Sequence, residues 1–139
     1  MLIQERVEFD GDPAEVWKRL SAIDRIPEFW HGTRSLQVLE RESPAPGTER
    51  VKAKAKFAFG GMGEVEITAD GAAMTLTSDY KSGAFKGRQE VRVVGKAIEA
   101  RWDVNFTGLF KLTSGWSGGH FASGTRHALE RLAGKPVQA

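Results

Sequence analysis

Polar side chains that could take part in chemistry are sparse on the strands that this sequence predicts. Ser78, Tyr80 and Gln89 alternate with charged residues, so we expect them on the inner face of a folded sheet. A tyrosine hydroxyl can donate a hydrogen bond to a ligand carbonyl, and a glutamine amide can donate or accept one. No carboxylate or histidine is predicted beside them on these strands to act as a general base. This pattern favours binding over catalysis, although the three side chains would also serve to satisfy one another or buried water.

Other titratable residues are weaker candidates for acid–base chemistry. His31 would lie at the mouth of a cavity at the end of a short helix, with a solvated loop position as the alternative. Glu5 would act only if it pointed inward from the first strand, and we expect it near a wet edge instead. His120 and His127 are seven residues apart, roughly 10 Å along a helix, which is too far for one metal ion. The catalytic candidates are therefore Tyr80, His31 and Glu5, none of them strong, and neither a metal nor a cofactor is expected.

Composition narrows the classes of function. A chain of 139 residues, 40% of them hydrophobic, predicts a single domain over residues 1–139 with a sizeable core. Its 20 basic and 18 acidic residues leave a net charge of only +2, which argues against a nucleic-acid binder. The absence of cysteine excludes disulfides, thiol nucleophiles and cysteine–zinc sites. Because no segment has the apolar core of a signal peptide or the roughly 20 apolar residues of a membrane span, we expect a cytoplasmic protein without stable membrane insertion.

Alternating hydrophobicity and turn residues predict seven strands and three helices. A first strand over 3–9 precedes a helix with Asp12 as its cap and Pro13 at its first position, and then a short helix that holds Phe29 and Trp30. A strand over 36–42 and a loop over 43–47 lead into a meander of five antiparallel strands between residues 48 and 106. The last helix, over 112–134, carries glycines in its first half, and we expect that half to be kinked or frayed.

Charge pairing and turn chemistry predict the registers of the meander. A two-residue turn at Gly95-Lys96 places each charge of one strand opposite its complement: Arg92 with Glu99, Glu90 with Arg101 and Arg88 with Asp103. A two-residue turn at Asp70-Gly71 would pair Ile67 with Met74 and Val65 with Leu76. A four-residue loop over 81–84 would pair Tyr80 with Phe85 and Ser78 with Gly87. A three-residue loop around Gly60 and Gly61 would set Lys52, Lys54 and Lys56 on the same face as Glu64 and Glu66.

The predicted inner face combines aromatic residues with unusually small ones. The facing helix also carries small residues, among them Gly115, Gly118, Gly119 and Ala122, so neither wall supplies enough volume to fill the interior. This favours a ligand pocket, and a helix that fills the space is the alternative. Trp116 either turns inward with His120, if Gly118 and Gly119 change the direction of the helix, or marks a contact with a partner or a membrane surface. Phe59 and Met62 at a hairpin tip would gate the pocket, touch a membrane or simply pack against a neighbouring loop.

Several short motifs are spaced along the chain. Residues 12–20 read DPAEVWKRL and are followed by IPEFW at 26–30, PGTER at 46–50 and ALERL at 128–132. Together they resemble the SRPBCC, or START-like, superfamily of polyketide cyclases and lipid-transfer proteins, nearest to its carbon-monoxide dehydrogenase-associated and cyclase/dehydrase branches. The resemblance spans nearly the whole chain. It implies an α+β helix-grip fold, in which a curved antiparallel sheet wraps a long C-terminal helix and a hydrophobic cavity lies between them, but it implies no particular reaction.

We therefore expect a protein that binds a small hydrophobic molecule such as a lipid, an isoprenoid or a polyketide-like compound. Transport of that molecule is one form that this function could take. A cyclase or dehydratase and an accessory protein that acts through a partner interface are the alternatives, and a homodimer is left open. The residues predicted to contact the ligand are Trp30, Phe57, Leu76, Ser78, Tyr80, Phe85, Gly87, Gln89, Trp102, Val104, Phe106, Gly118, Phe121 and Ala122.

Overall fold

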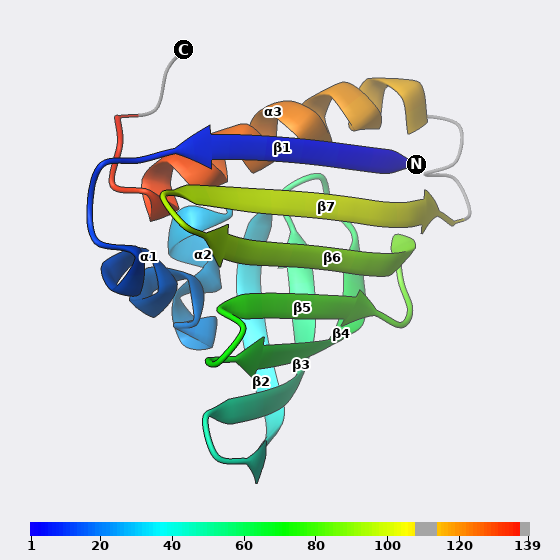
Figure 1. Cartoon of the computed structure of the whole chain (residues 1–139). Helices are drawn as coiled ribbons and strands as arrows, with labels where there is room; N and C mark the ends of the chain where they lie inside the picture. The colour runs from blue at the N-terminus through cyan, green and yellow to red at the C-terminus, as the bar shows by residue number, and fades with distance from the viewer. Residues whose placement is uncertain (108–113, 137–139) are drawn as a thin grey trace.

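A single antiparallel sheet of seven strands curves around one long helix (Figure 1). The computed structural model describes the backbone of residues 1–107 and 114–136, and the side chains of 1–107 and 119–136. The strand order is β1-β7-β6-β5-β4-β3-β2, so each strand from β2 to β7 pairs with its neighbour in sequence and β1 pairs with β7. The strands are β1 (Leu2–Glu8), β2 (Thr33–Ala45), β3 (Thr48–Phe57), β4 (Met62–Asp70), β5 (Thr75–Tyr80), β6 (Phe85–Val94) and β7 (Ala97–Phe106).

The helices lie at one end and on the concave side of the sheet (Figure 1). Helix α1 (Pro13–Leu20) begins as predicted, because Asp12 accepts a hydrogen bond from the Ala14 amide at 2.9 Å and proline occupies the first helical position. A 3₁₀ turn (Ile23–Arg25) leads into α2 (Ile26–Phe29). Helix α3 (Ser114–Leu132) lies alongside β1 and runs without interruption through its glycines, where we expected a kink. No described helix has a segment long and apolar enough to cross a bilayer.

Two of the predicted registers are correct. Arg92 lies opposite Glu99 and Glu90 opposite Arg101 in the β6–β7 hairpin. Lys54 lies opposite Glu64 in the β3–β4 hairpin, where a hydrogen bond from the Phe57 amide to the Gly61 carbonyl closes the predicted three-residue loop over 58–60. Charge pairing therefore predicted register wherever both strands carry alternating charges.

The β4–β5 and β5–β6 registers differ from the prediction. Asp70 accepts hydrogen bonds from the amides of Ala72 and Ala73, which stabilises a longer turn and pairs Ile67 with Ser78 instead of Met74. In the next hairpin Ser78 pairs with Gln89 instead of Gly87. Both shifts move a strand by an even number of residues, so every side chain stays on its predicted face. The edge strand β2 is also longer than expected and includes residues 43–45.

The core fills the space between the sheet and the C-terminal half of α3. Val51, Val91 and Val104 on the strands and Leu129 on the helix are completely buried. The Arg19 guanidinium donates to the Leu132 carbonyl at 2.7 Å, and the Arg131 guanidinium donates to the Phe29 carbonyl at 2.9 Å. These bonds satisfy a carbonyl at the end of α3 and hold the helix against α1 and α2. The first half of α3 lies toward the opposite end of the sheet, near the start of β1 (Figure 1).

Candidate functional site

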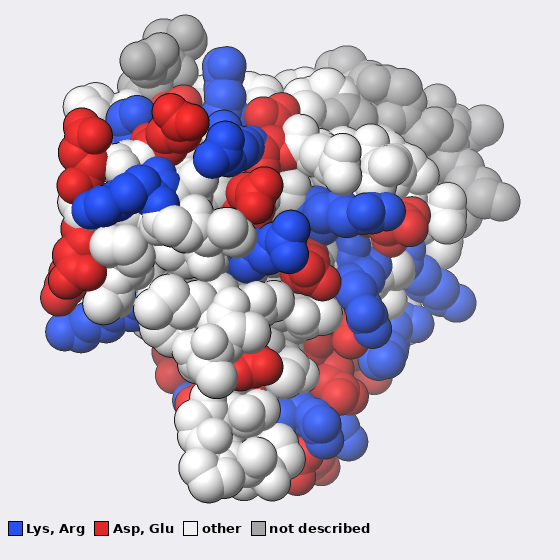
Figure 2. All heavy atoms as spheres, in the orientation of Figure 1, with Lys and Arg blue, Asp and Glu red and all other residues white. Residues whose placement is uncertain are grey.

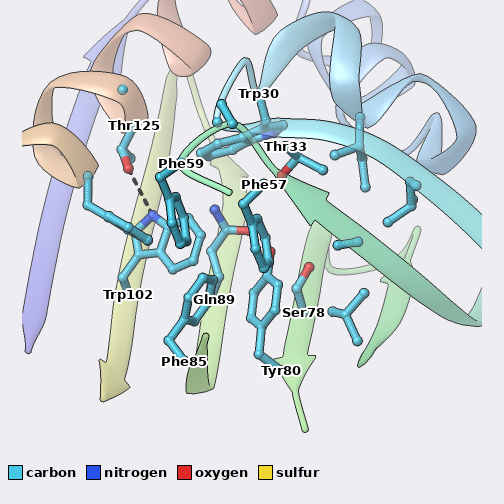
Figure 3. Close-up of a pocket in the computed structure, with 18 of the residues that line it drawn as sticks. Trp30, Thr33, Phe57, Phe59, Ser78, Tyr80, Phe85, Gln89, Trp102 and Thr125 are labelled. Atoms are coloured by element: carbon cyan, nitrogen blue, oxygen red, sulfur yellow. Dashed lines mark hydrogen bonds between the residues drawn. The ribbon is translucent and has the colours of Figure 1, made fainter. Parts of the chain in front are cut away.

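A cavity of about 300 Å³ lies between the sheet, α2 and α3 (Figure 3). Its walls come from β2 to β7, from the segment that joins α2 to β2, and from one face of α3. The described lining residues are mostly apolar: Ile26, Trp30, Gly32, Thr33, Leu36, Ala55, Phe57, Ala58, Phe59, Val65, Ile67, Leu76, Ser78, Tyr80, Phe85, Gln89, Trp102, His120, Phe121, Gly124 and Thr125. None of them is Asp, Glu, Lys or Arg, so the cavity suits an uncharged apolar molecule.

Aromatic rings form a connected wall on one side of the cavity. Phe85 lies at its centre, with ring centroids 4.6 Å from Tyr80, 5.0 Å from Phe57 and 5.4 Å from Phe121. Trp102 adds an edge-to-face contact with Phe121 at 5.1 Å. Each such pair stabilises the wall by about 0.5–1.5 kcal/mol beyond its buried area. The wall is therefore held in place by contacts among its own residues.

One row of side chains across the sheet brings polar groups into this apolar space. Ile67, Ser78, Gln89 and Trp102 are successive cross-strand partners on β4, β5, β6 and β7, and all four are buried. At the end of this row the Trp102 indole N–H donates to the Thr125 hydroxyl at 2.8 Å, in a buried hydrogen bond drawn in Figure 3. That bond joins the sheet to α3 and leaves the indole nitrogen with no further proton to donate.

Gln89 has an unpaired amide. Only 5% of the residue is exposed, and its Nε2 has no hydrogen-bond partner among the described residues. A buried donor without a partner costs about 1–3 kcal/mol, and such groups in native structures need a reason. Figure 3 shows this amide between the aromatic rings, facing the cavity.

Tyr80 is the other polar residue of the aromatic wall. Burial raises the pKa of its phenol above the ordinary value of about 10, so the hydroxyl stays neutral across the physiological range. Among the described residues nothing hydrogen-bonds to it. A neutral phenol can donate a proton to a hydrogen bond but cannot serve as a base, which limits the chemistry that it can support.

The cavity has a rim of small and aromatic residues. Phe59, on the β3–β4 hairpin, is 39% exposed, stacks parallel to Phe57 with 5.3 Å between centroids and lies 6.4 Å from Phe121. On the α3 side the rim includes Gly124, where an added Cβ would have no atom within 4 Å. The rim therefore has one bulky element on the sheet side and open space on the helix side.

Comparison with known proteins rests on structure alone, because neither the family models nor the curated proteins gave a match to the sequence. A protein from Thermus thermophilus aligns with a TM-score of 0.70 at 13% identity, over 96% of this chain and 95% of that one. A START superfamily protein from Mycobacterium smegmatis aligns with a TM-score of 0.67 at 14% identity, over 94% and 98%. The Zhui aromatase/cyclase from Streptomyces sp. R1128 aligns with a TM-score of 0.66 at 11% identity, over 100% and 96%.

The chain has the START-like helix-grip fold. The full-length overlap confirms the α+β architecture, in which a curved antiparallel sheet wraps a C-terminal helix. At 11–14% identity these likenesses concern the fold, and the chemistry of the cavity has to be argued from its own residues.

Most of the residues predicted to contact a ligand line the cavity of this START-like fold. They are Trp30, Phe57, Leu76, Ser78, Tyr80, Phe85, Gln89, Trp102 and Phe121. Val104 and Phe106 are buried beside the cavity without lining it, and the partly buried Ala122 does not line it either. Gly118 lies on α3, but its surroundings are outside the described residues, as is the side chain of Trp116.

Gly87 has a different role from the one predicted. It was predicted to contact the ligand, yet it does not line the cavity. Its φ of +138° is a backbone conformation that residues with a side chain rarely adopt, and a Cβ there would lie 2.2 Å from the Asp103 carbonyl oxygen. The glycine is required by the close approach of β6 and β7, so a larger residue there would disturb the sheet itself.

The other catalytic candidates lie outside the cavity. His31 is exposed, and its Nε2 lies 3.1 Å from the Glu28 carbonyl oxygen. Glu5 is half-buried on the edge strand β1, opposite Ala100, and does not line the cavity. Of the three candidates only Tyr80 faces the cavity. The described residues contain no group of three side chains suited to a metal ion.

Several lining residues were not predicted as contacts. Thr33, Leu36 and Ile26 come from the α2–β2 region, whose packing over the sheet no local pattern indicates. His120 and Gly124 lie on α3. The sequence did not decide which face of this helix points toward the sheet, because the answer depended on whether the glycines interrupt the helix. Ala55, Val65 and Ile67 had been placed on the inner face by strand alternation, and that signal would have found them.

Proposed function

We propose that this protein binds a compact, mostly apolar ring compound in the cavity. The observation that carries the proposal is a cavity of about 300 Å³ whose described walls include the rings of seven Phe, Tyr and Trp residues. His120 is the one residue with an acidic or basic side chain among the described lining residues. Interiors are normally packed without voids of this size, so a recess lined by prearranged rings is best explained by a ligand. The likeness to a protein described as an aromatase/cyclase supports a cyclic ligand.

The volume limits the size of the ligand. A water molecule takes up about 30 Å³ in the liquid, so the cavity corresponds to about ten waters, or a ligand of roughly 10–15 non-hydrogen atoms. That matches two or three fused rings or a short isoprenoid. A lipid with two acyl chains would leave most of its length outside, so we place phospholipids below ring compounds among the candidates.

The test uses fluorene, a planar tricyclic hydrocarbon, at trace concentration in equilibrium dialysis against excess protein. We expect a dissociation constant between about 20 micromolar and about 1 millimolar, because small ligands gain about 0.3–0.5 kcal/mol per non-hydrogen atom from such contacts. Native mass spectrometry of protein from its own host then asks which molecule of this size copurifies. Failure of fluorene to bind, together with a ligand-free protein, would contradict the proposal.

Two glycines of α3 provide a matched pair of variants. Gly124 lines the cavity and Gly119 does not, and an added Cβ at either position has open space around it. Both Gly124→Leu and Gly119→Leu should favour the helix by up to about 1 kcal/mol. We expect Gly124→Leu alone to weaken fluorene binding, so a loss in this variant cannot be attributed to unfolding. Equal binding by both variants would count against this wall of the site.

Catalysis of a cyclase or dehydratase type is the second candidate, and the neutral Tyr80 phenol in the cavity wall is the observation that favours it. Such a phenol would polarise a ligand carbonyl by donating a hydrogen bond. Turnover of a poly-carbonyl substrate that is abolished in Tyr80→Phe, while fluorene still binds, would support an enzyme. Turnover that survives the substitution would remove Tyr80 from the reaction.

A further inference from the structure

The cavity has hydrogen-bond donors that its own walls do not use. The Gln89 amide nitrogen is buried and unpaired, and nothing among the described residues hydrogen-bonds to the Tyr80 hydroxyl. Ser78 lies directly across from Gln89 on the neighbouring strand, but the two side chains form no hydrogen bond with each other. The Trp102 N–H is already donated to Thr125. The free capacity of this polar row is therefore centred on the Gln89 nitrogen.

An amide nitrogen can only donate. A hydrogen bond from this nitrogen requires an oxygen or another acceptor beside it, and the aromatic rings that line the same cavity favour an acceptor carried on a flat group. Apart from the His120 imidazole no basic side chain is among the described lining residues, so a carboxylate or phosphate would find no lysine or arginine there to offset the loss of its hydration. A neutral acceptor such as a ring carbonyl fits both conditions.

We propose that Gln89 selects ring compounds that carry a neutral hydrogen-bond acceptor, and that it does so by donating from Nε2 to that oxygen. This inference rests on the proposed function, because it concerns what the same cavity prefers among apolar ligands. Trp102 and Tyr80, whose rings stack on each other at 5.8 Å with 19° between their planes, line the same cavity as Gln89. The ligand is then held by its faces through the rings and oriented by one hydrogen bond.

Three tricyclic probes of nearly the same shape test this preference. Fluorene has no polar group, 9-fluorenone adds a carbonyl acceptor, and carbazole adds an N–H donor. In the wild type we expect 9-fluorenone to bind more tightly than fluorene. In Gln89→Met this preference, expressed as the ratio of the two affinities, should fall about tenfold, because methionine keeps the length of the side chain but removes the hydrogen-bond donor. Binding of fluorene itself should stay within about twofold. Each affinity is measured by equilibrium dialysis with trace ligand.

The control is Glu90→Met, the same replacement at the next residue of β6, whose side chain faces away from the cavity. It should leave all three affinities unchanged. If Gln89→Met were poorly folded, as judged by its thermal unfolding, Gln89→Leu would provide the same comparison. A glutamine that served only to pack the core would change the affinities of fluorene and 9-fluorenone together.

The outcomes separate this inference from the proposed function. If fluorene binds and Gln89→Met leaves the ratio of 9-fluorenone to fluorene unchanged, selection by Gln89 is wrong and ligand binding stands. Selection by Gln89 would also be wrong if Gln89→Met weakened the binding of carbazole relative to fluorene and left that of 9-fluorenone unchanged. That result would mean that the amide oxygen, and not the nitrogen, faces the ligand. If none of the three probes binds the wild type and the protein from its own host is also free of ligand, both the proposed function and this inference fail.

Discussion

The two faces of β5, β6 and β7 are built from alternating residues of the same strands, yet they are held by different forces. On the outer face Lys and Arg lie next to Asp and Glu (Figure 2), with Arg88 2.8 Å from Asp79 and Arg92 3.7 Å from Glu99. On the inner face the rings of Phe85 and Trp102 are buried, and Gln89 lies between them without a partner for its nitrogen. The charged groups of the outer face pair with one another or with water, whereas on the inner face the Gln89 amide nitrogen has no hydrogen-bond partner among the described residues.

This contrast shows where the sheet gains stability and where it leaves a polar group unpaired. Exposed ion pairs contribute little, because both charges are well hydrated when the pair is broken. Buried rings contribute several kcal/mol each, because water cannot replace their contacts. Substitutions on adjacent residues of one strand should therefore have very different effects, and the following predictions rank them.

Loss of the central ring should have the largest effect. Phe85 is 1% exposed, and its ring contacts five other aromatic rings, including that of Trp102. We expect Phe85→Ala to lower the free energy of unfolding by about 3–5 kcal/mol, measured by urea denaturation. Lys86→Ala, on the outer face of the same strand, should change it by less than about 0.5 kcal/mol. Comparable losses in both variants would remove the distinction between the faces.

A side chain at Gly87 should have the next largest effect. The glycine has a φ of +138°, and a Cβ would meet the backbone of Asp103 and Val104. Gly87→Ala should therefore cost at least about 2 kcal/mol through strain and displacement of β7. Gly95→Ala is the comparison. Alanine at a φ of +58° should lower the free energy of unfolding by about 1 kcal/mol, but the added Cβ would have open space around it. Urea denaturation of both variants is the measurement, and a smaller loss at position 87 would contradict the predicted clash.

The phenol of the inner face should make stability depend on pH. Tyr80 is the only tyrosine, and burial raises its pKa in the folded protein. Below about pH 10 the phenol is neutral in both states, so it has no effect. Above that pH only the unfolded chain loses the proton, and stability should fall by up to about 1.4 kcal/mol per pH unit. The difference between wild type and Tyr80→Phe in urea denaturation isolates this contribution, and phenolate absorbance near pH 10 in the folded protein would contradict it.

The outer ion pair should have the smallest effect. Arg88 and Asp79 approach to 2.8 Å, but 62% of the arginine side chain is exposed. A double-mutant cycle with Arg88→Ala and Asp79→Ala should give a coupling of about 0.2–1 kcal/mol that decreases in high salt. A coupling above about 2 kcal/mol, or one unaffected by salt, would mean that the outer face contributes more than its exposure suggests.

Strand alternation was the part of the sequence that predicted most. It placed Ser78, Tyr80 and Gln89 on the inner face even though two hairpin registers were wrong, because both errors shifted the strands by an even number of residues. The charges of Arg92 and Glu99 predicted the β6–β7 register directly. The turn after Asp70 could not be predicted as easily, because two forms of turn compete there and hydrogen bonds from Ala72 and Ala73 decide between them.

The remainder of the site depends on packing between distant segments. Thr33 reaches the cavity because α2 and the start of β2 fold over the sheet, and Thr125 meets Trp102 across 23 residues of sequence. The special backbone of Gly87 also arises only when β7 lies against it. None of these has a local signature in composition or periodicity. The unpaired Gln89 nitrogen likewise becomes visible only when every neighbouring donor and acceptor is in place.

The strand order has a consequence for how the chain folds. Every neighbouring pair in the sheet is adjacent in sequence except β1 and β7, which are separated by the whole meander. Hairpins from β2 to β7 can form one after another as short loops close, whereas β1 has to wait for β7, and the closure of so long a loop costs more entropy. We expect β1 to dock last, and its apolar residues Ile3 and Val7 to remain exposed until then.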